Sequence, residues 1–312
     1  MQGSRPDAGR YLDPQVLAKI TGLELRARLI VEGFLSGMHH SPHRGISVEF
    51  ADHRIYTQGD DLRHVDWKLF GRTDKHYIKE YEQETNLTLL LAVDCSESMN
   101  YRSAAEGLTK HEYATCLAAS ICYLALRQQD AVGLARFDER ITGFLRPSNN
   151  MLQWRTVVNE LAVRTGPAKT SVAQVCRELA ERLHHRTMII LISDLFDDAT
   201  NVLRGIQHLR YRRHELIVWN LWDEAELTFP FKGPTLFEGM EASGRLLTEP
   251  RSLREGYLQE VERFQNRLRA ECSRMQVDYA VFNTAMSLGT GLAGYLATRS
   301  ARLRQRSSRV LG

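Results

Sequence analysis

The chain has 312 residues, 43% of them hydrophobic, which supports a sizeable core and excludes a disordered or fibrous protein. With 41 Lys and Arg against 38 Asp and Glu, the formal net charge is only +3, which excludes a strongly basic wrapper of nucleic acid. There is no apolar run near the ~20 residues of a membrane span and no cleavable leader. We therefore predict a cytoplasmic protein without a membrane span or a nucleic-acid partner. Its five scattered cysteines, without C-x-x-C spacing, predict reduced thiols.

Residues 1–85 predict a small α+β segment that precedes the main domain. Apolar residues at near-helical spacing within residues 17–34 predict an amphipathic helix. Further along, Ile46, Val48 and Phe50 alternate with polar residues, in the way that short strands do. This part of the chain ends in short segments of mixed character.

From residue 87 onward, apolar segments alternate with amphipathic ones, which predicts a doubly wound, mostly parallel α/β sheet covered on both faces. We place this domain at residues 86–299 and a basic tail at residues 300–312. Strands are expected at residues 87–93, 131–137, 188–192, 216–222 and 277–282. Helices are expected near residues 114–124, 152–163, 172–183, 202–209 and 253–274, with a hairpin or excursion within 223–250 and a helix at the end.

A D-x-S-x-S sequence follows the first long strand directly and supplies Asp94, Ser96 and Ser98. In an open parallel sheet, ligands bind at the carboxyl ends of the strands, near the point where the strand order reverses. One carboxylate and two hydroxyls at alternate positions of a tight loop are oxygen ligands suited to Mg²⁺ or Mn²⁺. The loop therefore predicts a site for a hard cation.

Two further residues extend this set. The strand at residues 188–192 ends in Ser193-Asp194, which places a second carboxylate at the carboxyl end of another central strand. Thr170 lies in the loop that begins the helix before that strand. In the alternative interpretation, Asp94 and Asp194 only cap helices. That alternative does not explain why all five residues occur in this order.

These five positions resemble the metal-ion-dependent adhesion site of the von Willebrand factor A fold, in the order and strand positions typical of it. The chain also resembles the DUF58 family over nearly its whole length, most specifically in a Y-x-x-G-D-D-x-R-x-x-D-W block. The matching segments are Arg54-Ile55-Tyr56, Gly59-Asp60-Asp61-Leu62-Arg63, Val65-Asp66-Trp67, Lys79-Glu80-Tyr81-Glu82, Ser193-Asp194-Leu195-Phe196-Asp197, His214-Glu215, Phe229-Pro230-Phe231 and Gly233-Pro234.

The resemblance implies a von Willebrand factor A-like domain that binds protein partners and performs no catalysis. Members of the family are often encoded beside MoxR-type AAA+ ATPases, which implies a metal-dependent adaptor or co-chaperone for such an ATPase and an acidic client. Ser96 and Ser98 would bind Mg²⁺ or Mn²⁺ directly, whereas Asp94, Thr170 and Asp194 would bind directly or through water. Two carboxylates leave a divalent cation with an open, electrophilic position that a partner's Asp or Glu can fill. Asp197 would support the ligands.

A metal-dependent phosphohydrolase is the competing interpretation, because the D-x-S-x-S loop also resembles haloacid-dehalogenase phosphatases. There Asp94 would be the nucleophile, and Asp194 with Asp197 or Asp198 would hold Mg²⁺. That chemistry usually needs a second Asp as general acid where this chain has Ser96.

Four other features have weaker functional interpretations. The block containing Asp66 and Trp67 would be either a salt-bridged brace or a docking surface. The arginines of the C-terminal tail suit a solvated helix end, with contact to nucleic acid or anionic lipid as the alternative. The G-x-G-x-x-G at residues 289–294 lacks the following strand of a dinucleotide site. His39, His40 and His43 fit a surface loop better than a metal site.

Overall fold

The structure is a computed structural model that describes residues 22–28, 30–31, 53–55, 77–79, 87–163, 168–240 and 244–292. The chain divides into two compact units. One is Met38–Asn86, and the other combines Met1–Gly37 with Leu87–Gly312. The domain boundaries that we placed at residues 85 and 299 stay a prediction.

The smaller unit contains two short strands that pair antiparallel, β1 (His53–Ile55) and β2 (Tyr77–Lys79). Their register places His53 opposite Lys79. Most of the signature block, including Asp66 and Trp67, lies outside the described residues. The same holds for the three histidines at positions 39, 40 and 43 and for the basic tail.

The larger unit is built on a six-stranded sheet with the strand order β10-β7-β6-β3-β4-β5. All neighbours pair in parallel except β5, which runs antiparallel to β4 at one edge. The strands are β3 (Thr88–Asp94), β4 (Ala131–Phe137), β5 (Ile141–Ser148), β6 (Met188–Ser193), β7 (Glu215–Trp222) and β10 (Asp278–Asn283). The predicted doubly wound, mostly parallel sheet is confirmed.

The edge strand β5 was not predicted from the sequence. It contains Gly143 and Pro147, two residues that strands usually avoid and that here stand on an edge, where a missing donor is tolerated. Its neighbour β4 accommodates it closely at Gly133, where a Cβ atom would lie 2.7 Å from the carbonyl oxygen of Leu145. The antiparallel pairing therefore depends on a close backbone approach that residue propensities do not reveal.

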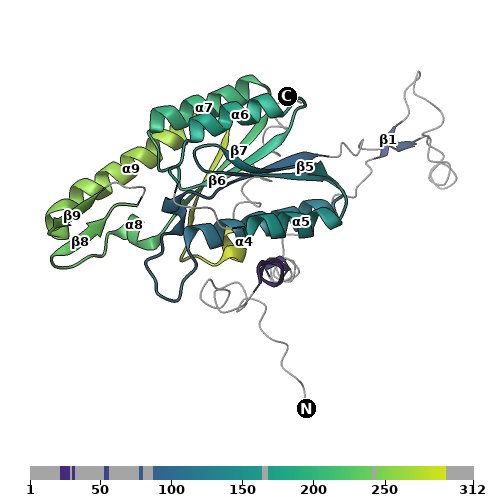
Figure 1. Ribbon diagram of the computed structural model, residues 1–312. Helices are drawn as coiled ribbons and strands as arrows, with labels where there is room; N and C mark the ends of the chain where they lie inside the picture. The colour runs from purple at the N-terminus through teal and green to yellow at the C-terminus, as the bar shows by residue number, and fades with distance from the viewer. Residues whose placement is uncertain are drawn as a thin grey trace, which may run out of the picture. The chain divides into compact units, whose positions relative to one another are not determined.

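Helices cover both faces of this sheet (Figure 1). Leu89, Leu91 and Val93 of β3 pack in one cluster with α4 (Lys110–Arg127) and α5 (Leu152–Leu161). The alternate residues Leu90 and Ala92 pack in the other cluster with α6 (Val172–Arg182), α7 (Ala199–Tyr211) and α9 (Pro250–Arg274). Because successive side chains of a strand point to opposite faces, a strand buried on both must be apolar throughout, as the run in β3 is.

The N-terminal segment adds a helix to the first of these two clusters. Residues 23–28 and 30–31 are helical, as their apolar spacing predicted. Ala27 and Ile30 are fully buried with the residues of α4 and α5. Arg28 lies over the ring of Trp154, with 5.1 Å between its guanidinium carbon and the ring centroid. The helix therefore belongs to the core of the larger unit.

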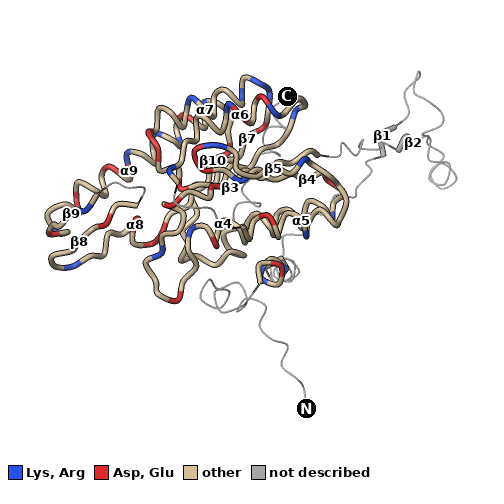
Figure 2. The backbone as a smooth tube through the Cα atoms, viewed as in Figure 1, with Lys and Arg blue, Asp and Glu red and all other residues tan. Residues whose placement is uncertain are grey.

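The excursion after β7 contains α8 (Glu224–Thr228) and an antiparallel pair, β8 (Thr235–Glu238) and β9 (Arg245–Thr248). The hairpin predicted within residues 223–250 is thus present. An aromatic cluster holds it to α9, and its members are Phe229, Phe231, Phe237 and Tyr257. Both acidic and basic residues lie along α9 (Figure 2). None of the described helices is long and apolar enough to cross a membrane.

The strand order reverses between β3 and β6. The helix that follows β3, α4, covers one face of the sheet, whereas the helix that follows β6, α7, covers the other. The loops that leave the carboxyl ends of these two strands therefore diverge, and this is the point at which open α/β sheets bind their ligands. Asp94 and Asp194 stand at the two sides of this switch point.

Candidate metal centre and adjoining pocket

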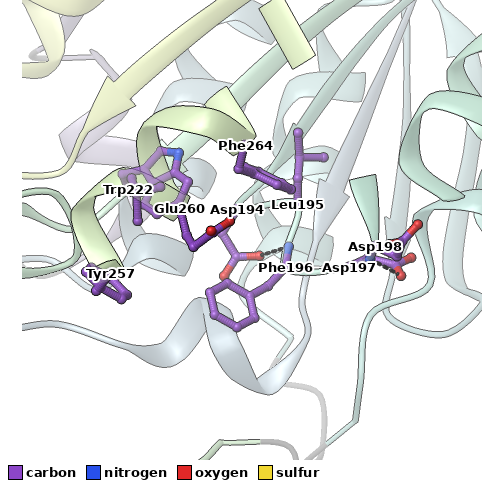
Figure 3. Close-up of a pocket in the computed structure, with 10 residues that line it drawn as sticks. Asp194, Leu195, Phe196, Asp197, Asp198, Trp222, Tyr257, Glu260 and Phe264 are labelled. Carbon is purple, nitrogen blue, oxygen red and sulfur yellow. Dashed lines mark hydrogen bonds between the residues drawn. The ribbon is translucent and has the colours of Figure 1, made fainter. Parts of the chain in front are cut away.

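A pocket of about 460 Å³ opens beside the loop that follows β6 (Figure 3). Aromatic residues form much of its wall: Phe196, Trp222, Tyr257 and Phe264. Asp194, Asp197, Asp198 and Glu260 contribute carboxylates to the same lining. Phe196 is 61% exposed, an unusual position for a residue with a large aromatic side chain. The pocket therefore combines an apolar surface with acidic groups next to the predicted metal ligands.

The D-x-S-x-S loop folds back on its own first residue. Asp94 ends β3 and is fully buried, and its Oδ1 accepts a hydrogen bond from the backbone N–H of Ser96 at 2.9 Å. The hydroxyls of Ser96 and Ser98 lie 3.1 Å apart. Glu97 begins a short 3₁₀ helix, η3 (Glu97–Asn100), and its N–H donates to the carbonyl of Ala168 at 2.9 Å. This turn places the carboxylate and both hydroxyls together, as the spacing predicted.

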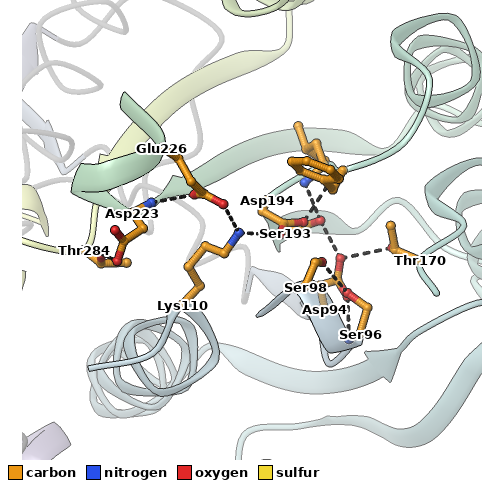
Figure 4. Close-up of polar contacts among 12 residues, drawn as sticks. Asp94, Ser96, Ser98, Lys110, Thr170, Ser193, Asp194, Asp223, Glu226 and Thr284 are labelled. Atoms are coloured by element: carbon orange, nitrogen blue, oxygen red, sulfur yellow. Dashed lines mark hydrogen bonds and ion pairs between the residues drawn. The ribbon is translucent and has the colours of Figure 1, made fainter. Parts of the chain in front are cut away.

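Two more hydroxyls reach the same carboxylate from other parts of the sheet (Figure 4). Thr170, in the loop before α6, donates to Oδ2 of Asp94 at 3.1 Å. Ser193, the last residue of β6, donates to the same oxygen at 2.6 Å. The predicted residues Asp94, Ser96, Ser98 and Thr170 therefore gather in one place, and Ser193 is an addition that the sequence did not single out.

Asp194 is held by the loop that follows β6. Its Oδ1 accepts from the N–H of Phe196 at 3.2 Å. Leu195 between them is buried in the left-handed region, with φ of 55°, and its N–H donates to Oγ of Ser193 at 2.8 Å. A non-glycine residue adopts this conformation only where its surroundings impose it, which is common at functional sites. The loop thus fixes the orientation of the second carboxylate, which contributes to the pocket lining.

The charge of Asp194 lies close enough to affect the ionisation of Asp94. Burial, and to a smaller extent the negative charge of Asp194, raise the pKa of Asp94 to about 7. Hydrogen bonds from Ser193 and Ser96 oppose this shift because they stabilise the ionised form. The fold thus maintains a buried acidic pair, which is costly unless a cation compensates it.

Within the described residues, a lysine that the sequence did not single out bonds to Asp194 of this pair. The Nζ of Lys110 donates to Oδ2 of Asp194 at 2.7 Å and to Oε1 of Glu226 at 2.8 Å. Its side chain is only 1% exposed. Burial alone would lower the pKa of Lys110, but the carboxylates of Asp194 and Glu226 outweigh it and raise that pKa. Lys110 is therefore charged inside the protein.

A signal for Lys110 does exist in the sequence. Thr109 and Glu112 form a capping box, the S/T-x-x-E pattern that marks a helix start, with reciprocal bonds of 3.1 and 3.0 Å. That pattern places Lys110 at the first position of the helix that follows the D-x-S-x-S loop. Its partners are 84 and 116 residues away, so only the fold shows which carboxylates it meets.

Glu226 belongs to a further carboxylate group at the start of α8. Its Oε2 accepts from the N–H of Asp223 at 2.8 Å. The carboxylate of Asp223 accepts from the N–H of Ser103 at 3.1 Å and from the hydroxyl of Thr284 at 3.3 Å. Lys110 thus connects the predicted metal centre to α8 (Figure 4).

The remaining predicted acid, Asp197, stands apart from Asp94 in the loop after β6. Its Oδ1 accepts from the N–H of Asp198 at 2.7 Å, and it lines the pocket. Asp198 caps α7 through bonds to the N–H groups of Thr200 and Asn201. A hydrogen bond from the side chain of Thr200, together with these backbone bonds, lowers the pKa of Asp198 below its usual value.

The donor set fits a hard divalent cation. It contains carboxylate and hydroxyl oxygens only, as Mg²⁺ and Mn²⁺ prefer. Neighbouring ligands of an octahedral Mg²⁺ lie about 3 Å apart, and the two serine hydroxyls are separated by 3.1 Å. Across the described residues, no group of three or more His, Cys, Asp or Glu side chains forms a metal site. A cation here would therefore depend on the hydroxyls.

Comparison with known proteins identifies the family of this chain. The model of the family described as "Protein of unknown function DUF58" matches residues 52–267. The chain belongs to the DUF58 family. The strand order and the single antiparallel edge strand give this DUF58 protein a von Willebrand factor A-like fold.

Its relatives include uncharacterized proteins of Mycobacterium tuberculosis (Rv1480) and Mycobacterium bovis (Mb1516). Each is 24% identical over 233 residues, which cover 74% of this chain and 72% of the relative. Among solved structures, BatB of Bacteroides thetaiotaomicron is 13% identical with a TM-score of 0.45, covering 69% of this chain and 99% of that one. The SpRpn10 VWA domain is 10% identical with a TM-score of 0.40, covering 67% and 94%.

Proposed function

We propose that this DUF58 protein is a non-enzymatic protein-binding module that captures a partner's carboxylate through a divalent cation. The ligands are Asp94, Ser96, Ser98, Thr170 and Asp194. The observation that carries the proposal is the 3.1 Å separation of the Ser96 and Ser98 hydroxyls beside a buried carboxylate at the switch point of the sheet. This arrangement offers neighbouring oxygen ligands where open α/β sheets bind their ligands.

The residues of the proposed site have different roles. Asp94 and Asp194 supply negative charge, and the serine hydroxyls are neutral donors of lone pairs. Thr170 and Ser193 keep the Asp94 carboxylate oriented through their hydrogen bonds. A bound cation would supply the electrophilic position for an incoming carboxylate.

The neighbouring pocket supports a protein partner. Its aromatic wall offers apolar contact area directly beside Asp194. Partner binding sites commonly combine one aromatic or apolar anchor with a few polar contacts that set orientation. A partner segment with an acidic residue next to an apolar one would use both features together.

We further propose that the module works with a MoxR-type AAA+ ATPase and an acidic client. This part of the proposal is supported by the resemblance to a family whose members are often encoded beside such ATPases. The chain has no Walker A sequence, so ATP hydrolysis would belong to the partner.

Direct titration with Mg²⁺ or Mn²⁺ in a calorimeter tests the cation site. The wild type should bind one ion per chain, and the S96A/S98A variant should bind none. Ser120→Ala is the matched control, because this buried hydroxyl bonds only to the carbonyl of Cys116 within α4. Unchanged affinity in S96A/S98A would place any bound ion elsewhere.

Capture of a purified MoxR-type ATPase from the same genome tests the partner. Wild type should retain it in Mg²⁺ and release it in EDTA, and S96A/S98A should not retain it under either condition. Equal retention in EDTA would contradict a metal-dependent contact. Turnover of p-nitrophenyl phosphate that disappears in Asp94→Asn but survives Thr170→Ala would favour the phosphohydrolase instead.

A further inference from the structure

Lys110 occupies a position that fold stability alone does not explain. It is the first residue of α4, where the helix dipole favours acidic side chains and disfavours a cation. Its ammonium group is buried, although water stabilises lysine strongly. Two carboxylates from distant segments compensate it, Asp194 on the loop after β6 and Glu226 on α8. The structure thus places a permanent cation against one of the proposed metal ligands.

The hydrogen bonds of Asp194 show what that cation does. Its Oδ2 is bonded to Lys110, and its Oδ1 accepts from the backbone of Phe196. A divalent cation that uses Asp194 must therefore share the negative charge that Lys110 already neutralises. Like charges at short range in a buried site repel strongly. Metal binding and the ion pair of Lys110 with Asp194 are thus in competition.

Glu226 provides an alternative partner for Lys110. Its Oε1 lies 2.8 Å from Nζ in the same structure, so the ammonium group keeps one carboxylate if it loses the other. The backbone N–H of Asp223 orients the opposite oxygen of Glu226. The chain can therefore accommodate the displaced lysine without leaving its charge unpaired.

We propose that Lys110 is a built-in competitor of the metal ion, which neutralises Asp194 in the metal-free protein and moves its charge to Glu226 when metal binds. This proposal rests on the proposed metal-dependent function. It makes Lys110 a residue that sets the affinity of the site. It also couples metal occupancy to α8, because the strengthened pair connects α4 to Glu226.

The test uses three variants of the full chain, titrated with Mn²⁺ in a calorimeter and followed by thermal unfolding with and without Mn²⁺. Lys110→Met removes the competitor, so Mn²⁺ should bind about tenfold more tightly, within the usual range of coupling between sites. Glu226→Gln removes the alternative partner, so Lys110 should hold Asp194 more firmly and Mn²⁺ should bind several-fold more weakly. The two variants should change the affinity for Mn²⁺ in opposite directions. A general loss of structure would weaken binding in both.

Lys169→Met is the matched control. Lys169 is exposed and next to Thr170, so this variant removes a nearby positive charge that solvent and salt already screen. Its affinity for Mn²⁺ should remain within about twofold of wild type, as expected for a screened surface charge. If Lys110→Met does not fold, the double variant K110M/E226Q replaces it, because it removes one charge of each sign and still leaves Asp194 without its lysine.

The outcomes distinguish this inference from the proposed function. Tighter binding in K110M or K110M/E226Q with weaker binding in E226Q supports the competition, whereas unchanged or weaker binding in both lysine variants overturns it. If wild type binds no Mn²⁺ but K110M does, the inference holds and the metal-dependent function fails. If no variant binds Mn²⁺, both fail. A metal-dependent increase in melting temperature that is larger for K110M than for wild type provides a second, independent readout.

Discussion

Ser193 donates a hydrogen bond to Oδ2 of Asp94 at 2.6 Å, which joins the carboxyl ends of β6 and β3 at the switch point of the sheet. The two residues are 99 positions apart in the chain, and both are fully buried. The same hydroxyl accepts from the N–H of Leu195, the residue with positive φ. One serine therefore supports both the first carboxylate and the loop that presents the second.

Replacing Ser193 by Ala should destabilise the protein. The change removes one donor to Asp94 and one acceptor for Leu195, and a buried group left without its partner costs about 1–3 kcal/mol. Urea unfolding in EDTA measures the loss directly. Ser120→Ala should cost much less, because its hydroxyl bonds only to its own helix. Equal losses in the two variants would mean that the bond to Asp94 contributes nothing specific.

Replacing Lys110 by Met should lower the stability of the metal-free protein by roughly 3–5 kcal/mol, because it leaves the buried carboxylate of Asp194 and the partly buried one of Glu226 uncompensated. The double variant K110M/E226Q should recover part of this loss, since one of those charges is also removed. Urea unfolding of wild type and both variants in EDTA provides the comparison. A double variant less stable than K110M would show that Glu226 has a structural role apart from the ion pair.

Replacing Phe196 by Ala should weaken partner binding about tenfold, since exposed aromatic anchors commonly contribute more than 1 kcal/mol to an interface. The affinity for Mn²⁺ should change much less, because Phe196 bonds to Asp194 only through its backbone N–H and its ring centroid lies 5.9 Å from the Nζ of Lys110. Retention of the purified ATPase measures the first effect, and calorimetry measures the second. Tyr211→Ala is the control, since this residue is 85% exposed and lies outside the pocket lining. Similar losses in both variants would argue against the pocket.

His214 should make stability depend on pH in the weakly acidic range. Burial, with a smaller effect of Arg212, lowers the pKa of His214 below 6.5. Its Nδ1 accepts from the N–H of Thr187 at 3.3 Å, which requires the neutral ring. Below pH 6.5 the unfolded chain therefore binds more protons than the folded one, so the free energy of unfolding falls as the pH falls.

The variant His214→Gln tests this dependence. Its side-chain oxygen can still accept a hydrogen bond but does not titrate, so the decline in stability between about pH 7.5 and pH 5.5 should become shallower. Urea unfolding at several pH values measures the slope. His185→Gln, at an exposed position, should leave the slope as in wild type. An unchanged slope in His214→Gln would assign the acid sensitivity to other groups.

The sequence by itself determined most of the sheet and four of the gathered residues. Strands buried on both faces must be apolar throughout, so β3 and β6 were readable as continuous runs. Asp94, Ser96 and Ser98 lie within one turn, and their spacing alone brings them together. The strand β5 was not predicted, because Gly143 and Pro147 are residues that strands usually avoid. Its pairing depends on the close backbone approach to β4.

Only the tertiary structure decided how the charges of the site are balanced. From the sequence, Lys110 at the start of a helix resembles a solvated surface residue. No neighbouring residue in the chain indicates that it pairs with Asp194 or Glu226. The sheet brings these three together across 84 and 116 residues, where burial makes each charge depend on its partners. Local sequence patterns specify strands and turns because those depend on near neighbours. The identity of a buried ion's partners depends instead on which strand ends the fold places side by side.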